Sequence, residues 1–207
     1  MSILIDFSQV IISNLFVGIG TIQDYTKKES QSNTLNLPDF GEIVTGQPDT
    51  KLPGKPGDKT VINEDMLRHM ILNILRYYKM KFGEKYGNLI ICCDNNHYWR
   101  KDVFPYYKAN RKKTRDKSAL DWHMIFESLN KIRDEIDVYL PYRVINVNNS
   151  EADDLIGVIS KIEKKNGPVL IISNDKDFIQ LIDKNVSLYR NISKELWVFD
   201  DSPTIAI

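Results

Sequence analysis

The sequence predicts an α/β fold with a mainly parallel central sheet and helices packed on it. The first observation is the run 169–172, which is wholly aliphatic. A strand without polar alternation is typical of a parallel sheet covered on both faces. The second observation is that Asp175 and Asp177 follow this run, and that two other apolar runs also lead to an aspartate. The third is that apolar residues recur at helical spacing between the runs. Strands and helices therefore alternate along the chain, as α/β folds require.

The N-terminal part of the chain contains a strand, a helix, a long polar stretch and a second helix. Residues 3–5 form an apolar strand that ends at Asp6, and the apolar spacing over 10–16 predicts a helix. Residues 20–59 are dominated by Lys, Ser, Gln, Asn, Thr, Pro and Gly. They predict a long mobile loop, either a plain insertion or a binding segment. Asn63 is the predicted N-cap of an amphipathic helix that follows.

The rest of the chain repeats the alternation of strand and helix. Residues 88–93 form an apolar strand that leads to Asp94, and Asp121 begins a helix with an apolar face. The strand 142–147 leads to an acidic helix start, and the run 169–172 leads to a short helical pattern. Two further strands are predicted, at 186–190 and 196–199.

Acidic side chains gather where these strands end. In a parallel sheet whose strands are joined by helices, the carboxyl ends lie along one edge, where α/β folds bind ligands. Helix capping is the alternative for part of the set, because Asp175 can cap the next helix and Ser150 with Asp153 resembles a capping box. Three carboxylates within 151–154 exceed what a cap requires. The carboxylates predicted to converge are Asp6, Asp94, Glu151, Asp153, Asp154, Asp175 and Asp177.

A cluster of this kind requires cations, because like charges at short range raise each other's pKa values. The donor atoms are all oxygen, and the sequence has no His or Cys spacing typical of a zinc site, so the set favours Mg²⁺ or Mn²⁺. Seven acids exceed the needs of one Mg²⁺. They suit two ions about 3.5–4 Å apart, the arrangement that cleaves phosphodiesters in line. The prediction is therefore two Mg²⁺ ions, with Mn²⁺ able to replace them.

Residues 97–117, called the basic segment, carry positive charge in a chain whose formal net charge is zero. The basic segment holds eight Lys and Arg residues against two acids, and aromatic residues are interleaved with them. A solvated helix face is the ordinary explanation of such a run. Nucleic-acid binding, by contrast, needs this combination of phosphate-attracting and base-stacking side chains. The acidic cluster predicts cleavage of phosphodiesters, and the basic segment predicts binding of nucleic acid. We therefore favour nucleic acid as the substrate.

Several other classes of protein are disfavoured. A chain of 207 residues with 42% hydrophobic residues fits one soluble domain. Cys92 and Cys93 are neighbours whose side chains point to opposite faces of a strand, which favours a reducing, cytoplasmic setting. No apolar stretch approaches the about 20 residues of a membrane helix. A Gly-x-x-x-x-Gly-Lys-Ser/Thr phosphate loop, a Gly-x-Ser-x-Gly elbow and a histidine metal pattern are also absent from the sequence.

Six motifs provide a further signal when they are taken together. They are Leu4-Ile5-Asp6-Phe7-Ser8, Cys93-Asp94-Asn95, Tyr98-Trp99-Arg100, Tyr107-Lys108-x-x-Arg111, Glu151-Ala152-Asp153-Asp154 and Ile172-Ser173-Asn174-Asp175-Lys176-Asp177. In this order they resemble the 5′-nuclease, or flap endonuclease, family, and within it the bacteriophage members with ribonuclease H activity. The resemblance implies a PIN-like three-layer α/β/α fold and a single catalytic domain over residues 1–207. It also implies a helical arch at about 97–120, through which a single-stranded 5′ end threads.

The resemblance also implies roles for individual residues. It places the seven carboxylates around two Mg²⁺ ions, without assigning each carboxylate to one ion. It places Lys108 and Arg111 at the scissile phosphate as catalytic residues, and Tyr107 beside the terminal base. The other expected substrate-binding residues of the basic segment are Arg100, Lys112 and Lys113.

Family members continue into a helix-three-turn-helix region that grips duplex DNA and adds an aspartate, in a Gly-Asp-x-x-Asp motif, to the second metal. The sequence ends before this region, so we expect a less complete second metal site. The expected function is 5′→3′ exonuclease and flap endonuclease activity with RNase H activity, in primer removal during DNA replication. The alternatives are a non-catalytic, structure-specific nucleic-acid-binding domain and a PIN-type ribonuclease. The second is disfavoured because such domains lack an arch.

The expected partners follow from the same resemblance. They are DNA and RNA–DNA hybrids with 5′ ends or flaps, together with single-stranded-DNA-binding or clamp proteins of a phage replisome. No membrane partner is expected. The expected location is the cytoplasm, which is that of the host cell if the chain is phage-encoded.

Overall fold

The computed structural model describes residues 1–16, 34–37, 41–44, 63–116 and 120–200. The chain divides into two compact units, and each is described by itself. The sheet unit comprises Met1–Val10, Tyr78–Tyr98 and Tyr142–Ile207, and the helical unit comprises Ile11–Tyr77 and Trp99–Pro141. Helix α2 (Glu64–Tyr86) contributes to both units.

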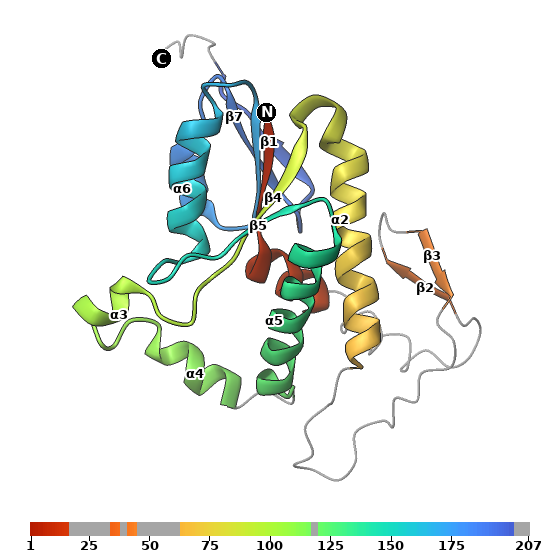
Figure 1. The fold of residues 1–207 in the computed structure, drawn as a ribbon, viewed down its shortest axis with the longest axis vertical. Helices are drawn as coiled ribbons and strands as arrows, with labels where there is room; N and C mark the ends of the chain where they lie inside the picture. Colours follow the sequence, from red (N-terminus) through yellow and green to blue (C-terminus); the bar gives the residue numbers. More distant parts are fainter. Residues whose placement is uncertain (17–33, 38–40, 45–62, 117–119, 201–207) are drawn as a thin grey trace, which may run out of the picture. The chain divides into compact units, whose positions relative to one another are not determined.

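The sheet unit is built on a six-stranded sheet with the strand order β5-β4-β1-β6-β7-β8 (Figure 1). Each neighbouring pair is parallel except β7 and β8, which confirms the predicted mainly parallel sheet. The chain adds β4 and β5 on one side of β1 and then returns to add β6 and β7 on the other. Open α/β sheets bind ligands beyond the carboxyl ends of the strands where the order reverses. The strands are β1 (Ser2–Asp6), β4 (Asn88–Cys92), β5 (Arg143–Ile145), β6 (Val169–Ile172), β7 (Val186–Arg190) and β8 (Glu195–Trp197).

Helices cover both faces of this sheet. On one face, α6 (Ala152–Glu163) packs against β1, β4 and β6, and Leu188 of β7 belongs to the same buried cluster. The next residue, Tyr189, points to the opposite face and contacts the rings of Tyr78 and Phe82 in α2, with centroids 6.1 and 4.9 Å away. Strands β1 and β6 are buried along their whole length, as their aliphatic sequences predict.

The helical unit contains α3 (Trp99–Val103), α4 (Ala109–Asp116) and α5 (Trp122–Tyr139), together with the first part of α2. The predicted N-cap Asn63 is confirmed, and Asp121, which was predicted to begin a helix, also caps it. Asn63 accepts from the N–H groups two and three residues further on at 2.8 and 3.2 Å, and Asp121 does the same at 3.1 and 3.2 Å. Among the described helices, none combines the length and apolar character needed to cross a bilayer.

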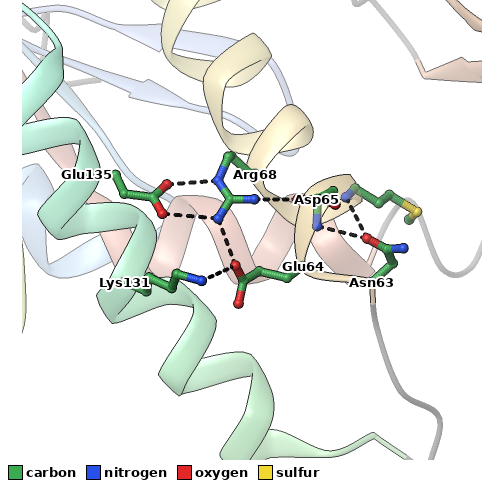
Figure 2. A network of polar contacts seen from close by, with 7 residues as sticks. Asn63, Glu64, Asp65, Arg68, Lys131 and Glu135 are labelled. Carbon is green, nitrogen blue, oxygen red and sulfur yellow. Dashed lines mark hydrogen bonds and ion pairs between the residues drawn. The ribbon is translucent and has the colours of Figure 1, made fainter.

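Arg68 joins α2 to α5 within the helical unit (Figure 2). Its Nε and Nη2 atoms donate to Glu135 at 2.8 and 3.1 Å, and its Nη1 atom donates to Asp65 at 2.6 Å. Glu64 accepts from Arg68 and from Lys131, both at 2.7 Å. The Arg68 guanidinium lowers the pKa of Glu135, and Lys131 and Arg68 lower the pKa of Glu64. This two-point contact with Glu135 fixes one helix against the other.

The stretch 20–59, expected to be one loop, contains a two-stranded antiparallel sheet of β2 (Thr34–Leu37) and β3 (Gly41–Val44). The alternation Thr34-Leu35-Asn36-Leu37 is a strand pattern that the polar composition of the stretch obscures. The other residues of 20–59 lie outside the described residues, so the mobility of the stretch remains a prediction.

Two helix starts also differ in detail from the predictions. The capping box begins at Glu151 rather than Ser150. Glu151 has extended backbone angles, φ −99° and ψ 164°, and its N–H donates to Asp154 Oδ2 at 3.1 Å. The segment after the 169–172 strand is a 3₁₀ helix, η1 (Lys176–Leu181), and its six residues are too few for a stable amphipathic α-helix.

Candidate metal centre

The seven predicted metal-binding carboxylates all belong to the sheet unit and follow its strands. Asp6 is the last residue of β1, and Asp94 lies two residues beyond β4. The acids of 151–154 begin α6, and Asp175 and Asp177 follow β6. Since β1 pairs in parallel with both β4 and β6, these ends share one edge of the sheet. We call this set of carboxylates the acidic edge.

Glu151, Asp153 and Asp154 form a close acidic group within the acidic edge. One carboxylate oxygen of each lies within 4.8 Å of the other two. Glu151 is 2% exposed, although Glu is rarely this buried unless it is paired or binds a cation. Three anionic groups at this distance repel each other, and a divalent cation offsets that repulsion. The group therefore has the spacing and chemistry of a cation site.

Asp6 is held by two neighbours that the sequence did not single out as site residues. Ser173 Oγ donates to Asp6 Oδ2 at 3.0 Å, and the backbone N–H of Gln9 donates to Asp6 Oδ1 at 3.4 Å. Gln9 Oε1 accepts from the backbone N–H of Asn174 at 3.0 Å and lies 3.3 Å from Ser173 Oγ. Gln9 thus links the end of β1 to the loop that follows β6.

Burial and the charge of Asp94 raise the pKa of Asp6 to about 7. The hydrogen bonds from Ser173 and Gln9 oppose this rise, and Asp175 adds a smaller repulsion. Asp6, Asp94 and Asp175 are therefore close enough to interact as charges. Below about pH 7 the folded chain without a cation favours a protonated Asp6, whereas a bound divalent cation favours the carboxylate.

Asp94 is connected to α6 by a backbone hydrogen bond. The N–H of Ala152 donates to Asp94 Oδ1 at 2.9 Å, which places an anion at the N-terminus of this helix, where its dipole is favourable. Asn146 Nδ2 donates to the backbone oxygen of Asp94 at 3.1 Å, and Asn146 Oδ1 accepts from Asn95 at 2.7 Å. These contacts fix the loop after β4 to the loop before α6, and so hold Asp94 beside the acidic group of 151–154.

Asp175 and Asp177 are more exposed than Asp6 and Glu151. Asp175 caps η1, because its Oδ1 accepts from the N–H of Asp177 at 3.0 Å, and its own N–H donates to Ser173 Oγ at 3.1 Å. The capping alternative considered for Asp175 is therefore realised. Asp177 enters this network through its backbone N–H, and the residue is exposed. The metal-binding role of these two residues remains a prediction.

The donor set of the acidic edge fits a hard divalent cation, because every predicted ligand is a carboxylate oxygen. Sequence reasoning missed Gln9, Ser173 and Asn146, which hold the carboxylates in place. Ser173 lies inside the motif that ends at Asp177, but its contact with Asp6 joins residues far apart in the sequence. Gln9 follows Asp6 by three residues at the start of a helix. An aspartate just before a helix, followed three residues later by a glutamine, has the capping-box spacing, and that spacing is the signal that could have found Gln9.

The basic segment lies mainly in the helical unit, and its side chains are largely exposed. Helix α3 has no buried residue. The Arg100 guanidinium lies 4.9 Å from the ring centroid of Trp99, and Lys108 Nζ lies 5.1 Å from that of Tyr107. Lys108 has a left-handed backbone, φ 56°, as Asn149 and Lys194 also do; this conformation is strained for a residue with a side chain. Arg111 is exposed on α4.

The roles predicted for the basic segment remain predictions. Lys108 and Arg111 are the predicted catalytic residues, and Tyr107, Arg100, Lys112 and Lys113 are the predicted substrate-binding residues. The side chains of Lys112 and Lys113 lie outside the described part of the structure.

Comparison with known proteins identifies the family. Residues 55–204 match the model of the 5′-3′ exonuclease, N-terminal resolvase-like domain. The chain belongs to the 5′-3′ exonuclease family. Its relatives include the ribonuclease H of Enterobacteria phage T4, 40% identical over 157 residues, which cover 74% of this chain and 50% of the relative. A 5′-3′ exonuclease of Buchnera aphidicola is 32% identical over 136 residues, 64% of this chain and 44% of the relative. The chain thus spans about half the length of the curated relatives it matches.

Solved structures of this family show the same fold. The flap endonuclease of bacteriophage T5, in a complex with DNA and metal ions, aligns over 95% of this chain and 57% of its own, with a TM-score of 0.59 and 17% identity. The T5 5′-exonuclease with bound zinc aligns over 96% of this chain and 58% of its own, with a TM-score of 0.58 and 14% identity. The predicted PIN-like α/β fold and the predicted nuclease family are therefore both confirmed.

Proposed function

We propose that the chain hydrolyses phosphodiester bonds at the 5′ ends of RNA–DNA hybrids, flaps and single strands, with two Mg²⁺ ions that Mn²⁺ can replace. One observation carries the proposal. The group formed by Glu151, Asp153 and Asp154 is joined to Asp94 through the Ala152 N–H, at the same sheet edge as the buried Asp6. An edge that gathers this many carboxylates is suited to binding divalent cations and, through them, a phosphate.

Within this proposal, the acidic edge holds the metal ions. When bound, the ions supply a hydroxide nucleophile and stabilise the leaving oxygen. Gln9 and Ser173 orient the Asp6 carboxylate, and the Ala152 N–H orients Asp94. Because these groups are held before substrate arrives, little reorganisation is needed at the moment of reaction.

The basic segment supplies the contacts to the nucleic acid. Lys108 and Arg111 stabilise the charge that develops on the scissile phosphate, and Tyr107 stacks on the terminal base. Arg100, Lys112 and Lys113 attract the phosphates of the strand without reading its sequence. The left-handed backbone at Lys108, in the turn between α3 and α4, supports a functional role for this residue, because residues held in sparsely populated backbone regions cluster at active sites and ligand clamps.

The names of the relatives support the substrate class. The T4 relative is a ribonuclease H, and the T5 structural neighbour is a flap endonuclease. We therefore place this chain in the removal of RNA primers and 5′ flaps during DNA replication, in the cytoplasm of a host cell if it is phage-encoded. Its proposed protein partners are the single-stranded-DNA-binding or clamp proteins of a phage replisome.

A cleavage assay tests the proposal. A flap substrate and an RNA–DNA hybrid, both labelled at the 5′ end, are incubated with the chain in Mg²⁺, in Mn²⁺ and in EDTA. We expect short 5′ products with either metal and none in EDTA. Glu151→Gln, tested beside the unchanged chain, should bind the substrates and release no product. Binding without cleavage by the unchanged chain in either metal would instead indicate a non-catalytic nucleic-acid-binding domain.

A further inference from the structure

A row of adjacent, tilted aromatic rings in the helical unit continues from the end of the basic segment. The ring centroids of Phe16 and Trp122 are 5.8 Å apart, and those of Trp122 and Phe126 are 5.7 Å apart, with interplanar angles of 47° and 32°. The guanidinium carbon of Arg115 lies 5.2 Å from the Phe126 centroid. We call these four residues the aromatic row.

The aromatic row is assembled from three segments of the helical unit. Phe16 is the last described residue of the helix 7–16, and Arg115 lies in the last turn of α4. Trp122 and Phe126 are four residues apart in α5, so they lie on one side of that helix. The row therefore begins where the basic segment ends.

Core packing alone does not account for this row. The core face of α5 consists of residues that are at most 4% exposed, namely Ile125, Leu129, Ile132 and Ile136. Trp122, Phe126 and Arg115 are half-buried, at the margin of that face, and Phe16 is 48% exposed. A large aromatic ring that remains half in water can still stack on a planar ligand.

We infer that the aromatic row is a stacking subsite for an unpaired nucleobase of a single-stranded nucleic acid, entered at Phe16. This inference rests on the proposed function and adds a base-binding position that is distinct from Tyr107. Aromatic rings stack on any base, and Arg115 adds a cation to the row through its contact with Phe126. The sequence of α4 contains four basic residues against one acid, which attracts the phosphates of the same strand. An apolar protein partner would not need these cations.

Binding of two single strands in EDTA tests the inference without any cleavage. One strand carries normal bases, and the other has the same length with abasic sites in place of bases. We expect Phe16→Leu to weaken binding of the normal strand by about five- to tenfold, since one stacked base contributes that much, and to leave binding of the abasic strand unchanged. Phe16→Tyr keeps an aromatic ring and should restore the affinity. Tyr139→Leu, which removes an 80% exposed ring near the other end of α5, is the matched control and should change neither strand.

The outcomes separate this inference from the proposed function. Unchanged binding of the normal strand by Phe16→Leu, or an equal loss for both strands, overturns the subsite. Metal-dependent cleavage by that variant would then leave the proposed function intact. If the unchanged chain neither binds nor cleaves nucleic acid, both fail. Thermal melting of each variant shows whether it is folded. If Phe16→Leu does not fold, Phe16→Tyr serves as the test. A loss of base-dependent binding in Phe16→Tyr, which retains the aromatic ring, contradicts stacking.

Discussion

The acidic edge and the basic segment are organised in opposite ways. The acidic edge grows out of buried strands, and two of its carboxylates are nearly inaccessible, with Asp6 8% and Glu151 2% exposed. The basic segment is made of short helices, and its aromatic residues face water, as Tyr106 does at 76% exposure. The groups proposed to carry out the chemistry are therefore fixed by the fold, while the groups proposed to contact nucleic acid depend little on burial.

The difference has an electrostatic reason. Carboxylates that must share a cation need to be held at a short, constant separation, and this requires rigid backbone and additional hydrogen bonds. Cations that attract a phosphate backbone act over about 8–10 Å at moderate salt, so their side chains do not need to be fixed in advance. Substitutions in the two regions should accordingly affect different measurements.

The largest effect is expected from Glu151→Gln. Glutamine keeps the size of the buried side chain but removes its charge, so the fold should persist while metal-dependent cleavage falls by at least about 1,000-fold. The measurement is the cleavage rate in saturating Mg²⁺, with thermal melting to check the fold. Asp137→Asn, an exposed carboxylate on α5, is the control and should retain full activity. Substantial activity in Glu151→Gln would remove this residue from the site.

The next largest effect concerns the stability of the metal-free chain. The folded-state pKa of Asp6 is about 7, against an ordinary value of 3.8, so the folded state binds this proton more tightly than the unfolded state does. The free energy of unfolding should therefore fall as the pH rises from about 4 to 7, by on the order of 4 kcal/mol in total. Asp6→Asn removes this penalty.

Urea unfolding in EDTA at pH 5 and pH 8 measures the effect. The variant should exceed the unchanged chain in stability at pH 8, and its advantage should be clearly smaller at pH 5. Added Mg²⁺ should reduce the advantage at pH 8, because the cation stabilises the ionised carboxylate of the unchanged chain alone. A stability difference that is the same at both pH values would contradict the buried, repelled state of Asp6.

Substitutions in the basic segment should have intermediate effects of two kinds. Lys108→Ala and Arg111→Ala should lower turnover by about 10- to 100-fold, because each removes a cation that we propose stabilises the developing phosphate charge. Lys112→Ala and Lys113→Ala should mainly weaken binding and reduce the salt dependence of affinity by about one phosphate contact each. Single-turnover rates and binding at several salt concentrations separate the two. Equal affinity losses with unchanged turnover in all four variants would make the segment an electrostatic surface alone.

The smallest effect is expected from Gln9→Ala. The substitution removes the acceptor that links the helix 7–16 to the loop after β6, so the Asp6 carboxylate loses part of its orientation. Metal affinity should fall by about tenfold, with a near-normal rate once metal is saturating. Gln180→Ala, an exposed glutamine on η1, is the control. If Gln9→Ala binds Mg²⁺ as tightly as the unchanged chain, the orienting role is wrong.

The parts of the fold that the sequence predicts best are those where one physical effect dominates. The unbroken aliphatic character of 169–172 can be satisfied only by burial on both faces, so strand and parallel sheet follow together. Side chains that cap helices were equally predictable at Asn63 and Asp121, because the hydrogen bonds are local in sequence.

The parts that sequence reasoning missed depend on contacts between distant residues or on weak local preferences. The contact of Gln9 with Asn174 spans 165 positions and depends on how β1 and β6 align. The one-residue error at Glu151 arose because Ser150 and Glu151 are both followed, three residues later, by an aspartate. The β2–β3 pair was missed because its alternation is short and lies within a polar stretch.

Isothermal titration of Mg²⁺ into the 207-residue chain tests the central claim most directly, namely that the acidic edge is a divalent-cation site. The titration is run beside Glu151→Gln and beside the control Asp137→Asn. We predict saturable binding to the unchanged chain and to Asp137→Asn, and a clear loss of heat and affinity in Glu151→Gln. The same isotherm for all three proteins, or no saturable binding to the unchanged chain, would contradict it.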